Sequence, residues 1–222
     1  MPNQKELTRR RFLLLAGSAA GTALVSTACD AIAGHAGSEV RFINTSYGEE
    51  NSMSKKVLVT YASRTGSTAG VADAIGKALA KKGASIDVKP MGEVNDLGQY
   101  HAVVAGSAIR GQKWLPEATE FLSVHQAEIS HKPFASFMVC ITLAMKNGDQ
   151  YREGLKSWMA SVRSAGKPLG EGYFAGALDL DKLSGMDKIK MGTAASLGIF
   201  PKGDFRDWNA IEAWADSLSG IL

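Results

Sequence analysis

Four hydroxyl side chains gather in one short segment, Ser63-Arg64-Thr65-Gly66-Ser67-Thr68, which follows an apolar run and precedes a helical pattern. A turn from a strand into a helix leaves its first backbone N–H groups unpaired, and the helix dipole adds partial positive charge there. Hydroxyl donors supplement these groups, and Gly66 lets the backbone approach a ligand closely. The segment therefore indicates anion binding, and a phosphate monoester with three acceptor oxygens suits it best.

Two other phosphate-binding motifs are absent from the sequence. No Gly-x-Gly-x-x-Gly segment follows the strand, so the fingerprint of dinucleotide-binding proteins is missing. The segment around Gly76-Lys77 resembles a P-loop only superficially. Val71 stands where its first glycine is required, and Ala78 replaces the magnesium-binding Ser or Thr. An NTPase is therefore disfavoured.

The other reactive residue types form no catalytic or metal-binding pattern. Cys140 lies within an apolar run, which predicts an inert buried thiol. No Ser-His-Asp or Cys-His arrangement follows from the spacing, so no catalytic residue is assigned. The histidines lack the close pairing of metal ligands, and we expect no metal site. They are His35, His101, His125 and His131.

Alternating strand and helix patterns surround the hydroxyl-rich segment. Residues Val57–Tyr61 form a short apolar, β-branched run, as expected of a strand buried on both faces. The segment is followed by helical spacing of Val71, Ile75, Ala78 and Leu79, and Gly83 predicts the end of that helix. Ser85–Lys89 then alternates as a second strand.

Three more strands and three more helices are expected after these. The strands are Ala102–Ala105, Phe137–Leu143 and Tyr173–Leu178. One helix opens at Pro116, a second runs from about Asp149 to Gly166, and the last begins near Phe205 with Asp204 as its N-cap. The second is expected to bury Leu155, Trp158, Met159 and Val162, and the last Trp208, Ile211, Ala215 and Leu218. Residues 179–203 show some helical spacing but several glycines, and no element is assigned there.

Strands separated by helices at this spacing predict an α/β fold with a parallel sheet and helices on both faces. Five strands in about 165 residues, with the phosphate-type turn directly after the first, favour a five-stranded doubly wound sheet over a six-stranded dinucleotide fold. The right-handed crossover rule leaves few other arrangements.

The first thirty residues have the order of an export signal. Thr8-Arg9-Arg10-Arg11-Phe12-Leu13 matches the twin-arginine pattern, and a weakly apolar stretch follows that is too short and too polar to be a convincing membrane-spanning helix. The stretch ends at Ser26-Thr27-Ala28-Cys29, which is similar to a lipoprotein cleavage site except that Ser26 stands where leucine is usual. We expect twin-arginine export to an extracytoplasmic or periplasmic location, with Cys29 as a candidate for lipidation and membrane tethering.

The chain divides into three regions on this view. Residues 1–29 are the signal, residues 30–54 form a polar tether, and residues 55–222 form the folded domain. Within the tether, Val40, Phe42 and Ile43 offer one short edge strand. A twin-arginine signal carries proteins that are already folded, which suits a protein that binds a cofactor before export.

The net charge of +3 comes from the N-terminus alone. The first 28 residues hold four basic residues and one acidic residue, which leaves 21 basic and 21 acidic residues in the remainder. A nucleic-acid-binding protein usually carries a basic excess or stripe. This class is therefore excluded.

The segment Ser63–Thr68 resembles the phosphate loop of flavodoxins, (Ser/Thr)-x-Thr-Gly-x-(Thr/Ser). Within that superfamily the chain is most similar to the branch that includes menaquinone-dependent protoporphyrinogen oxidase. The similarity covers about residues 55–220 and rests on Val103–Arg110, Cys140–Ala144, Phe174–Leu178 and Asp207-Trp208. It implies a flavodoxin-like fold and FMN as the cofactor.

The resemblance also implies which residues contact FMN. The phosphate would be held by Ser63, Arg64, Thr65, Gly66, Ser67 and Thr68. The isoalloxazine would lie between the loops Ser107–Trp114 and Thr142–Lys146. Its neighbours would be Ser107, Ala108, Ile109, Arg110 and Gly111 from the first loop, and Thr142, Leu143 and Ala144 from the second. Two roles stay open, because Arg110 suits either a flavin or substrate contact or a solvated loop position, and Trp114 either stacks on the flavin or caps the next helix.

The function implied is that of an FMN-dependent oxidoreductase that moves electrons between a donor and a quinone or a redox partner protein. The loops here, GQKW and AMKNGD, are less basic than those of the protoporphyrinogen oxidases, so fold and cofactor transfer more firmly than substrate. The first alternative is a non-enzymatic flavodoxin-type electron carrier, against which the neutral charge of the mature chain argues. The second is a flavin-free module that holds another phosphate ligand.

Overall fold

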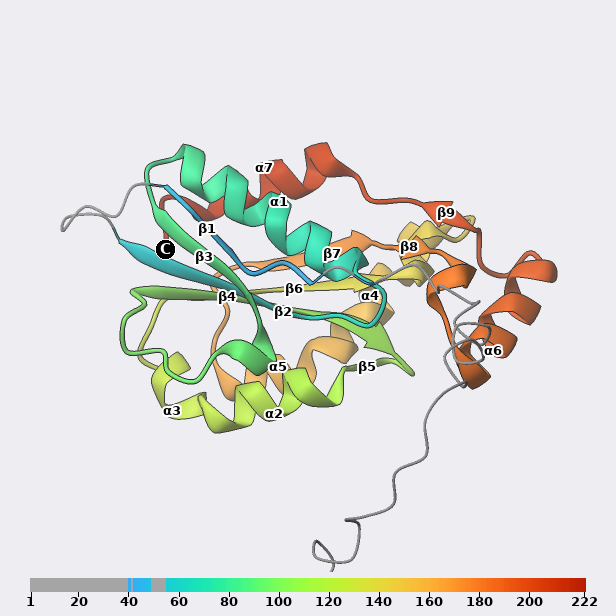
Figure 1. Ribbon diagram of the computed structural model, residues 1–222, viewed down its shortest axis with the longest axis horizontal. Coiled ribbons are helices and arrows are strands. Elements are labelled where there is room, and N and C mark those ends of the chain that lie inside the picture. Colours follow the sequence, from blue (N-terminus) through green and yellow to red (C-terminus); the bar gives the residue numbers. More distant parts are fainter. Residues whose placement is uncertain (1–39, 41, 49–54) are drawn as a thin grey trace, which may run out of the picture. The chain divides into compact units, whose positions relative to one another are not determined.

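The computed structural model describes residue 40, residues 42–48 and residues 55–222. Its main sheet has the order β1-β3-β2-β4-β6-β7 (Figure 1). The five strands from β3 to β7 in this order run parallel to their neighbours, which confirms the doubly wound parallel sheet. These strands are β2 (Lys56–Ala62), β3 (Ser85–Pro90), β4 (Ala102–Arg110), β6 (Phe134–Cys140) and β7 (Glu171–Ala175).

Four short strands complete the strand set of the described residues. The hairpin strand β5 (Lys113–Trp114) pairs with the end of β4. Strand β8 (Ala177–Leu178) pairs with β9 (Gly203–Asp204) in a separate two-stranded sheet. Strand β1 (Thr45–Tyr47) runs antiparallel to β3 at the sheet edge.

The strands are apolar because both faces of the sheet are covered by helices (Figure 1). On one face lie α1 (Ser67–Lys81) and α7 (Trp208–Leu218). The other face is covered by α2 (Pro116–Val124), α3 (Gln126–Ile129), α4 (Arg152–Leu155) and α5 (Ala160–Ala165). The connection from β3 to β4 contains only the 3-10 turn η1 (Met91–Glu93).

The first strand and the first helix predicted for the folded domain are confirmed. Strand β2 leads through the hydroxyl-rich segment into α1, which buries Val71, Ile75, Ala78 and Leu79 as expected. Helix α1 ends at Lys81, and Gly83 takes a left-handed conformation with φ 92°. Helix α2 opens at Pro116 as predicted and buries Ala118, Phe121 and Leu122, and the helix breaks at His125 before α3.

Three strand predictions were wrong in their bounds. The third strand continues past Ala105 to Arg110. The fourth strand begins at Phe134 and ends at Cys140, and Ile141–Ala144 forms the 3-10 turn η2 instead. Apolar character continues past the point where the chain leaves the sheet, because these residues are half-buried against the domain. The fifth strand begins earlier, at Glu171, and Gly176 separates β7 from β8.

The helix expected from Asp149 to Gly166 is a series of short helical turns. The turns η3 (Gly148–Tyr151) and η4 (Lys156–Met159) flank α4, and α5 follows. The residues Leu155, Met159 and Val162 are buried as predicted, but Trp158 is only half-buried. Gly154, which has low helix propensity, lies within this series.

The last helix begins three residues later than expected, at Trp208. Its N-cap is Asp207, whose carboxylate accepts a hydrogen bond from the backbone N–H of Ala210 at 3.0 Å. Asp204 lies in β9 and pairs with Arg206 instead. Trp208 was predicted to face inward but is 45% exposed, while Ile211, Ala215 and Leu218 are buried.

Part of the predicted tether joins the sheet. The edge strand is Thr45–Tyr47, slightly later than the expected residues Val40, Phe42 and Ile43. Ile43 nevertheless anchors this segment, since its N–H donates to the Tyr61 hydroxyl at 2.6 Å and its carbonyl accepts from it at 3.0 Å. The predicted signal, with Cys29, lies outside the described residues.

Residues 179–203, which the sequence pattern left unassigned, contain the turn η5 (Leu180–Lys182) and helix α6 (Gly185–Ser196). No residue of α6 is buried. Within the described part of the chain, no helix is long and apolar enough to cross a membrane. The same residues contain no cluster of three or more His, Cys, Asp or Glu side chains suited to a metal ion.

Candidate functional site

The loop Ser63–Thr68 joins β2 to α1 at the carboxyl edge of the parallel sheet. Gly66 precedes the helix in the left-handed region, with φ 84°, which glycine adopts without strain. Its N–H donates to Ser63 Oγ at 3.0 Å, which fixes the turn. Among the described residues no side chain caps α1, and its first turn holds no acidic residue. The helix start is therefore open to an anion.

Thr68 adds a hydroxyl with an unmet hydrogen-bonding requirement. Its side chain is fully buried in the first turn of α1. Thr68 Oγ1 has no hydrogen-bond partner among the described residues. Because a buried unpaired hydroxyl is costly, this atom indicates a ligand that accepts its hydrogen bond.

Arg64 lies at the rim of the loop. Its guanidinium donates to Glu117 Oε2 of α2 at 3.0 Å, and both side chains are substantially exposed. An ion pair of this exposure contributes little stability, so Arg64 is available to a second anion.

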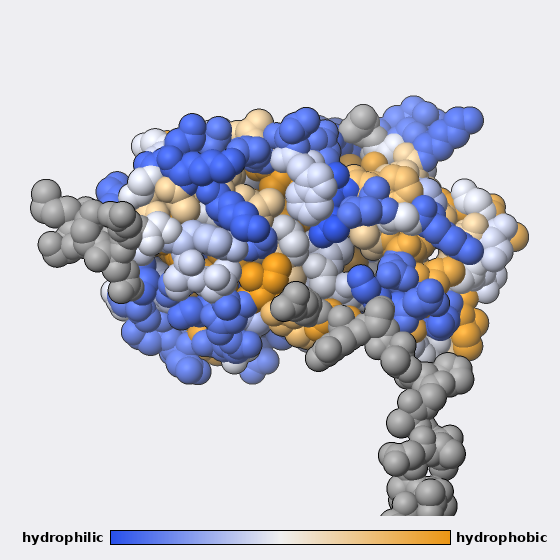
Figure 2. Space-filling view, turned by 45° about the horizontal axis from the view of Figure 1, so that its top comes forward, coloured by the Kyte–Doolittle hydropathy of each residue, from blue (hydrophilic) through white to orange (hydrophobic). Residues whose placement is uncertain are grey.

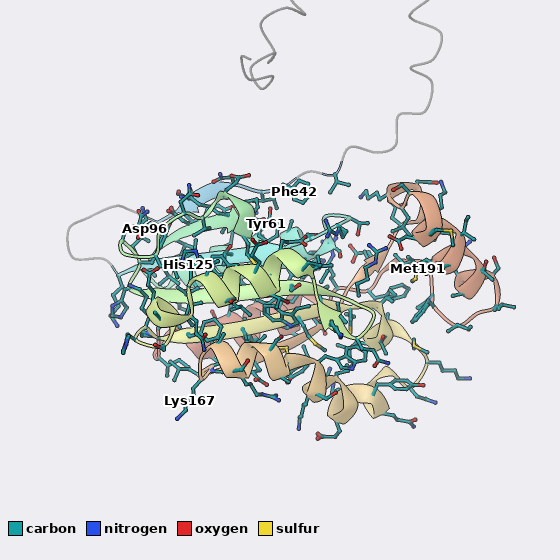
Figure 3. All side chains as sticks on the ribbon, turned by 90° about the horizontal axis from the view of Figure 1, so that it is seen from below. Phe42, Tyr61, Asp96, His125, Lys167 and Met191 are labelled. Carbon is teal, nitrogen blue, oxygen red and sulfur yellow. The ribbon has the colours of Figure 1, made fainter. Side chains whose placement is uncertain are left out.

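A cavity of about 460 Å³ opens from the phosphate-type loop. The loop contributes Arg64, Thr65 and Ser67 to its wall. The strand ends and α6 contribute most of the rest: Ala108, Ile109, Arg110, Gly111, Val139, Cys140, Ile141, Gly176, Ala177, Leu178, Leu183, Asp187, Lys190 and Met191. Figure 3 labels Met191 beyond the ends of the sheet strands. We call this space the loop cavity.

A second cavity, of about 690 Å³, adjoins the loop cavity and shares Ile109, Arg110, Gly111, Cys140, Ile141 and Met191 with it. It lies between the chain after β4 and the chain after β6, where the sequence resemblance placed the isoalloxazine. Its other walls are largely apolar or aromatic and include Met145, Tyr151, Leu155, Trp158 and Phe200. We call this space the ring cavity.

The chain after β4 takes unusual conformations at the ring cavity. Gly111 has φ 55° and Gln112, which is not a glycine, has φ 64°. Left-handed conformations of non-glycine residues cost energy and gather at functional sites. The hairpin is held by Ser107, whose Oγ donates to the Ala108 carbonyl at 2.8 Å and accepts from the Leu115 N–H at 3.0 Å.

The structure brings most, but not all, of the predicted site residues to a cavity wall. Those that line one are Arg64, Thr65, Ser67, Ala108, Ile109, Arg110, Gly111 and Thr142. Ser63, Gly66 and Thr68 shape the loop behind the wall. Ser107 is fully buried and holds the hairpin, and Leu143 and Ala144 line neither cavity.

The structure bears on the two residues whose roles the sequence left open, Arg110 and Trp114. Arg110 forms an ion pair with Asp187 of α6 and lines both cavities, so it is neither unpaired nor remote from the site. Trp114 is 3% exposed, and its Nε1 donates to Met159 Sδ at 3.4 Å. The indole therefore packs within the core and lines neither cavity.

Cys140 lies between the two cavities at the end of β6. The thiol is 5% exposed, and burial raises its pKa. It stays protonated at neutral pH and presents an apolar surface, which confirms the expectation of a buried thiol.

Sequence reasoning missed the wall that α6 provides. Asp187, Lys190 and Met191 reach the loop cavity from a segment for which no element was predicted. It also missed Gly176, where an added Cβ would lie 3.6 Å from Ser67 Oγ and 3.0 Å from Val139 Cγ1. A glycine directly after the fifth strand was the available signal for this close approach.

Arg206 fastens the segment before α7 to the phosphate-type loop. Its Nη1 donates to the Ser67 carbonyl at 3.4 Å, and its guanidinium lies 4.4 Å from the Trp208 ring centroid. Asp204 holds the guanidinium at 2.5 Å. The arrangement needs Gly70, because a Cβ there would lie 2.3 Å from Arg206 Nη1.

Comparison with known proteins gives a family match. The family model described as "Flavodoxin domain" matches residues 58–198. No curated protein sequence matched the chain.

Similar solved structures include an archaeal flavodoxin, with 21% identity, a TM-score of 0.41, and coverage of 65% of this chain and 94% of that one. A flavodoxin from Streptococcus pneumoniae TIGR4 has 15% identity, a TM-score of 0.49, and coverage of 75% and 99%. A Fusobacterium nucleatum flavodoxin bound to flavin mononucleotide has 17% identity, a TM-score of 0.37, and coverage of 55% and 69%.

Proposed function

The chain belongs to the flavodoxin-domain family, whose cofactor is FMN, and we propose that it is an FMN-dependent oxidoreductase. It moves electrons between a donor and a quinone or a redox partner protein. The observation that carries the proposal is the open start of α1, with its buried unpaired Thr68 hydroxyl, beside two adjoining cavities.

The described residues suit both the phosphate and the ring of FMN. The uncapped first turn of α1 supplies N–H groups for the phosphate, and Thr68 supplies a hydroxyl without another partner among the described residues. The two cavities, of about 460 and 690 Å³, are within the usual range of ligand pockets. The ring cavity is mainly apolar, as a flavin ring requires.

Bound FMN supplies the redox chemistry, as hydride or single-electron transfer. The chain binds the phosphate through Ser63–Thr68 and excludes water with Ile109, Cys140 and Ile141. Gly111 and Gln112, in their left-handed conformations, line the ring cavity. No side chain is assigned as an acid or a base.

The finer assignment is to the branch that resembles menaquinone-dependent protoporphyrinogen oxidase. Its support is the segment Ser107–Arg110, which ends β4 beside the ring cavity, together with the turn Ile141–Ala144 after β6. A quinone is the favoured electron acceptor on this basis.

We also propose that the protein is exported by the twin-arginine route and tethered to the membrane. The supports are the pattern Thr8–Leu13 and the lipoprotein-type site that ends at Cys29, both of which precede the described residues. A cofactor that binds before export is consistent with this route.

The alternative is a non-enzymatic electron carrier. The balance of 21 basic and 21 acidic residues after residue 28 disfavours it, since small carriers of this fold usually use a strongly acidic surface to reach basic partners.

Titration of the purified full chain with FMN, followed by flavin fluorescence and absorbance, tests the proposal. We expect stoichiometric binding, and a protein that ignores FMN refutes it. Turnover with a soluble quinone in the absence of any protein partner then supports the enzyme. Reversible reduction of the bound flavin without quinone turnover supports the carrier.

A further inference from the structure

Helix α6 has its larger apolar side chains on the outside. The residues Met186 and Ile189 are each 62% exposed, and Leu197, directly after the helix, is 71% exposed. Helical spacing places these three on one face, which we call the outer face of α6. The opposite side carries Asp187 and Met191, which line the loop cavity. An amphipathic helix that packs on its own domain has the reverse arrangement.

The exposed apolar residues are concentrated rather than scattered. Of the ten large hydrophobic residues exposed in the described part of the chain, four lie between Met186 and Ile199. Figure 2 shows hydrophobic surface at the end of the domain that α6 occupies. Single exposed apolar residues need no explanation, but a cluster of this kind marks an interaction surface.

Basic residues border this apolar cluster. Between residues 185 and 202 there are three lysines, Lys188, Lys190 and Lys202, and one acidic residue, Asp187. Asp187 is paired with Arg110 on the cavity side. Lys188 has only a 3.6 Å contact with the exposed Asp181 carboxylate. Lysines beside an apolar face extend toward anionic headgroups while their aliphatic stems stay in the interface.

We propose that the outer face of α6 docks onto the surface of an anionic lipid bilayer. Apolar residues with a lysine border match the two components of such a surface, acyl chains and anionic headgroups. The sequence also offers Cys29 as a candidate for lipidation, and such an anchor would bring the domain within reach of a bilayer. The docking itself requires no flavin. Because Asp187, Lys190 and Met191 of the same helix line the loop cavity, docking sets that cavity beside the lipid.

An environment-sensitive fluorophore attached to the outer face tests the docking directly. The full chain carries Cys29→Ser, which removes the candidate lipidation site, and Leu197→Cys for labelling, while Cys140 stays unlabelled because it is 5% exposed. The matched control places the label at Val124→Cys, which is also 71% exposed. Val124 precedes His125, and Figure 3 shows His125 and Met191 at opposite sides of the view.

Vesicles of phosphatidylcholine with about one third phosphatidylglycerol should blue-shift the label at position 197 and raise its intensity several-fold, while the label at position 124 stays unchanged. Co-sedimentation without any change at position 197 overturns the proposal, because the N-terminus alone would then hold the protein. A change that depends on protein concentration without vesicles also overturns it in favour of a second copy. FMN titration of the same samples checks the proposed function separately.

A second variant set confirms the docking without a label. In the Cys29→Ser background, Met186→Ser, Ile189→Ser and Leu197→Ser together should lower vesicle partitioning at least about fivefold. The control set Val124→Ser, Leu169→Ser and Ile221→Ser changes three exposed apolar residues elsewhere and should leave it unchanged. Equal partitioning of the two sets contradicts the proposal.

Discussion

Thr68→Val separates the cost of an unpaired hydroxyl from the benefit of a ligand contact. The substitution keeps the shape of the side chain and removes only Oγ1, which is fully buried and unpaired among the described residues. If this hydroxyl exists to bind phosphate, its removal has opposite effects on the free protein and on the complex.

The two magnitudes follow from the burial of the group. An unsatisfied buried hydroxyl costs about 1–3 kcal/mol, so the variant without FMN should be more stable by about 1 kcal/mol. A hydrogen bond to a charged phosphate contributes about 1.5–3 kcal/mol, so the Kd for FMN should rise about 10- to 150-fold.

Urea unfolding of the FMN-free protein measures the first effect, and titration by flavin fluorescence measures the second. Ser136→Ala is the control, because Ser136 Oγ is also buried and unpaired among the described residues but lies near the start of β6, outside the phosphate loop. Its affinity for FMN should match that of the unchanged protein. Wild-type FMN affinity in Thr68→Val would refute the phosphate role of this hydroxyl.

Three further predictions concern stability. Gly106→Ala should lower the free energy of unfolding by about 3 kcal/mol, since its Cβ would lie 2.0 Å from Phe137 Cζ, and an unchanged urea midpoint would contradict this packing. Burial alone would raise the pKa of Asp87, but hydrogen bonds from Ser46, Tyr100 and Lys89 lower it to about 2. Because this folded pKa is depressed, about 2 kcal/mol of stability should be present above pH 4 and be lost as the pH falls toward 2. Urea unfolding at several pH values should show this acid dependence weakened in Asp87→Asn, and an identical acid limb would count against it. Asp207→Ala should cost about 1 kcal/mol through loss of the α7 cap, while Asp204→Ala should leave α7 helicity by circular dichroism unchanged; equal losses in both would contradict the cap assignment.

The parts of the site that could be predicted are those that local sequence determines. The loop Ser63–Thr68 combines a strand end, a left-handed glycine and a helix start within six residues, so its geometry depends on few distant contacts. The apolar runs that became β2 and β4 were likewise recognisable, because a strand covered on both faces has continuous apolar character. Strand β3 was recognisable from its alternation instead.

The predictions were wrong where the same apolar residue pattern occurs both in a strand or helix core and in a turn or at the surface. Ile141 and Leu143 are as apolar as the strand before them, yet they form a 3-10 turn, because the pattern reports burial and not sheet pairing. Trp208 has the spacing of an inward residue at the start of α7. Its ring instead lies beside the Arg206 guanidinium at the domain surface, a contact that depends on where the loop crosses α1.

Helix α6 shows why the second wall of the site was not predicted. Its spacing is weakly helical and none of its residues is buried, so no internal pattern indicates which face it turns to the domain. Its position depends on the pairing of β8 with β9 on either side of it and on the contact between Arg110 and Asp187.

The site therefore combines walls of two kinds. The phosphate loop and the ends of β4 and β6 are fixed by the register of a fully buried sheet, and they cannot move without breaking strand pairing. The wall on α6 is held by a two-residue strand pair and an exposed ion pair, and such an ion pair contributes at most about 1 kcal/mol. Cofactor affinity should follow from the first wall, whereas access to the cavities should depend on the second. Contact between the outer face of α6 and a membrane would then act on access while leaving the phosphate loop unchanged.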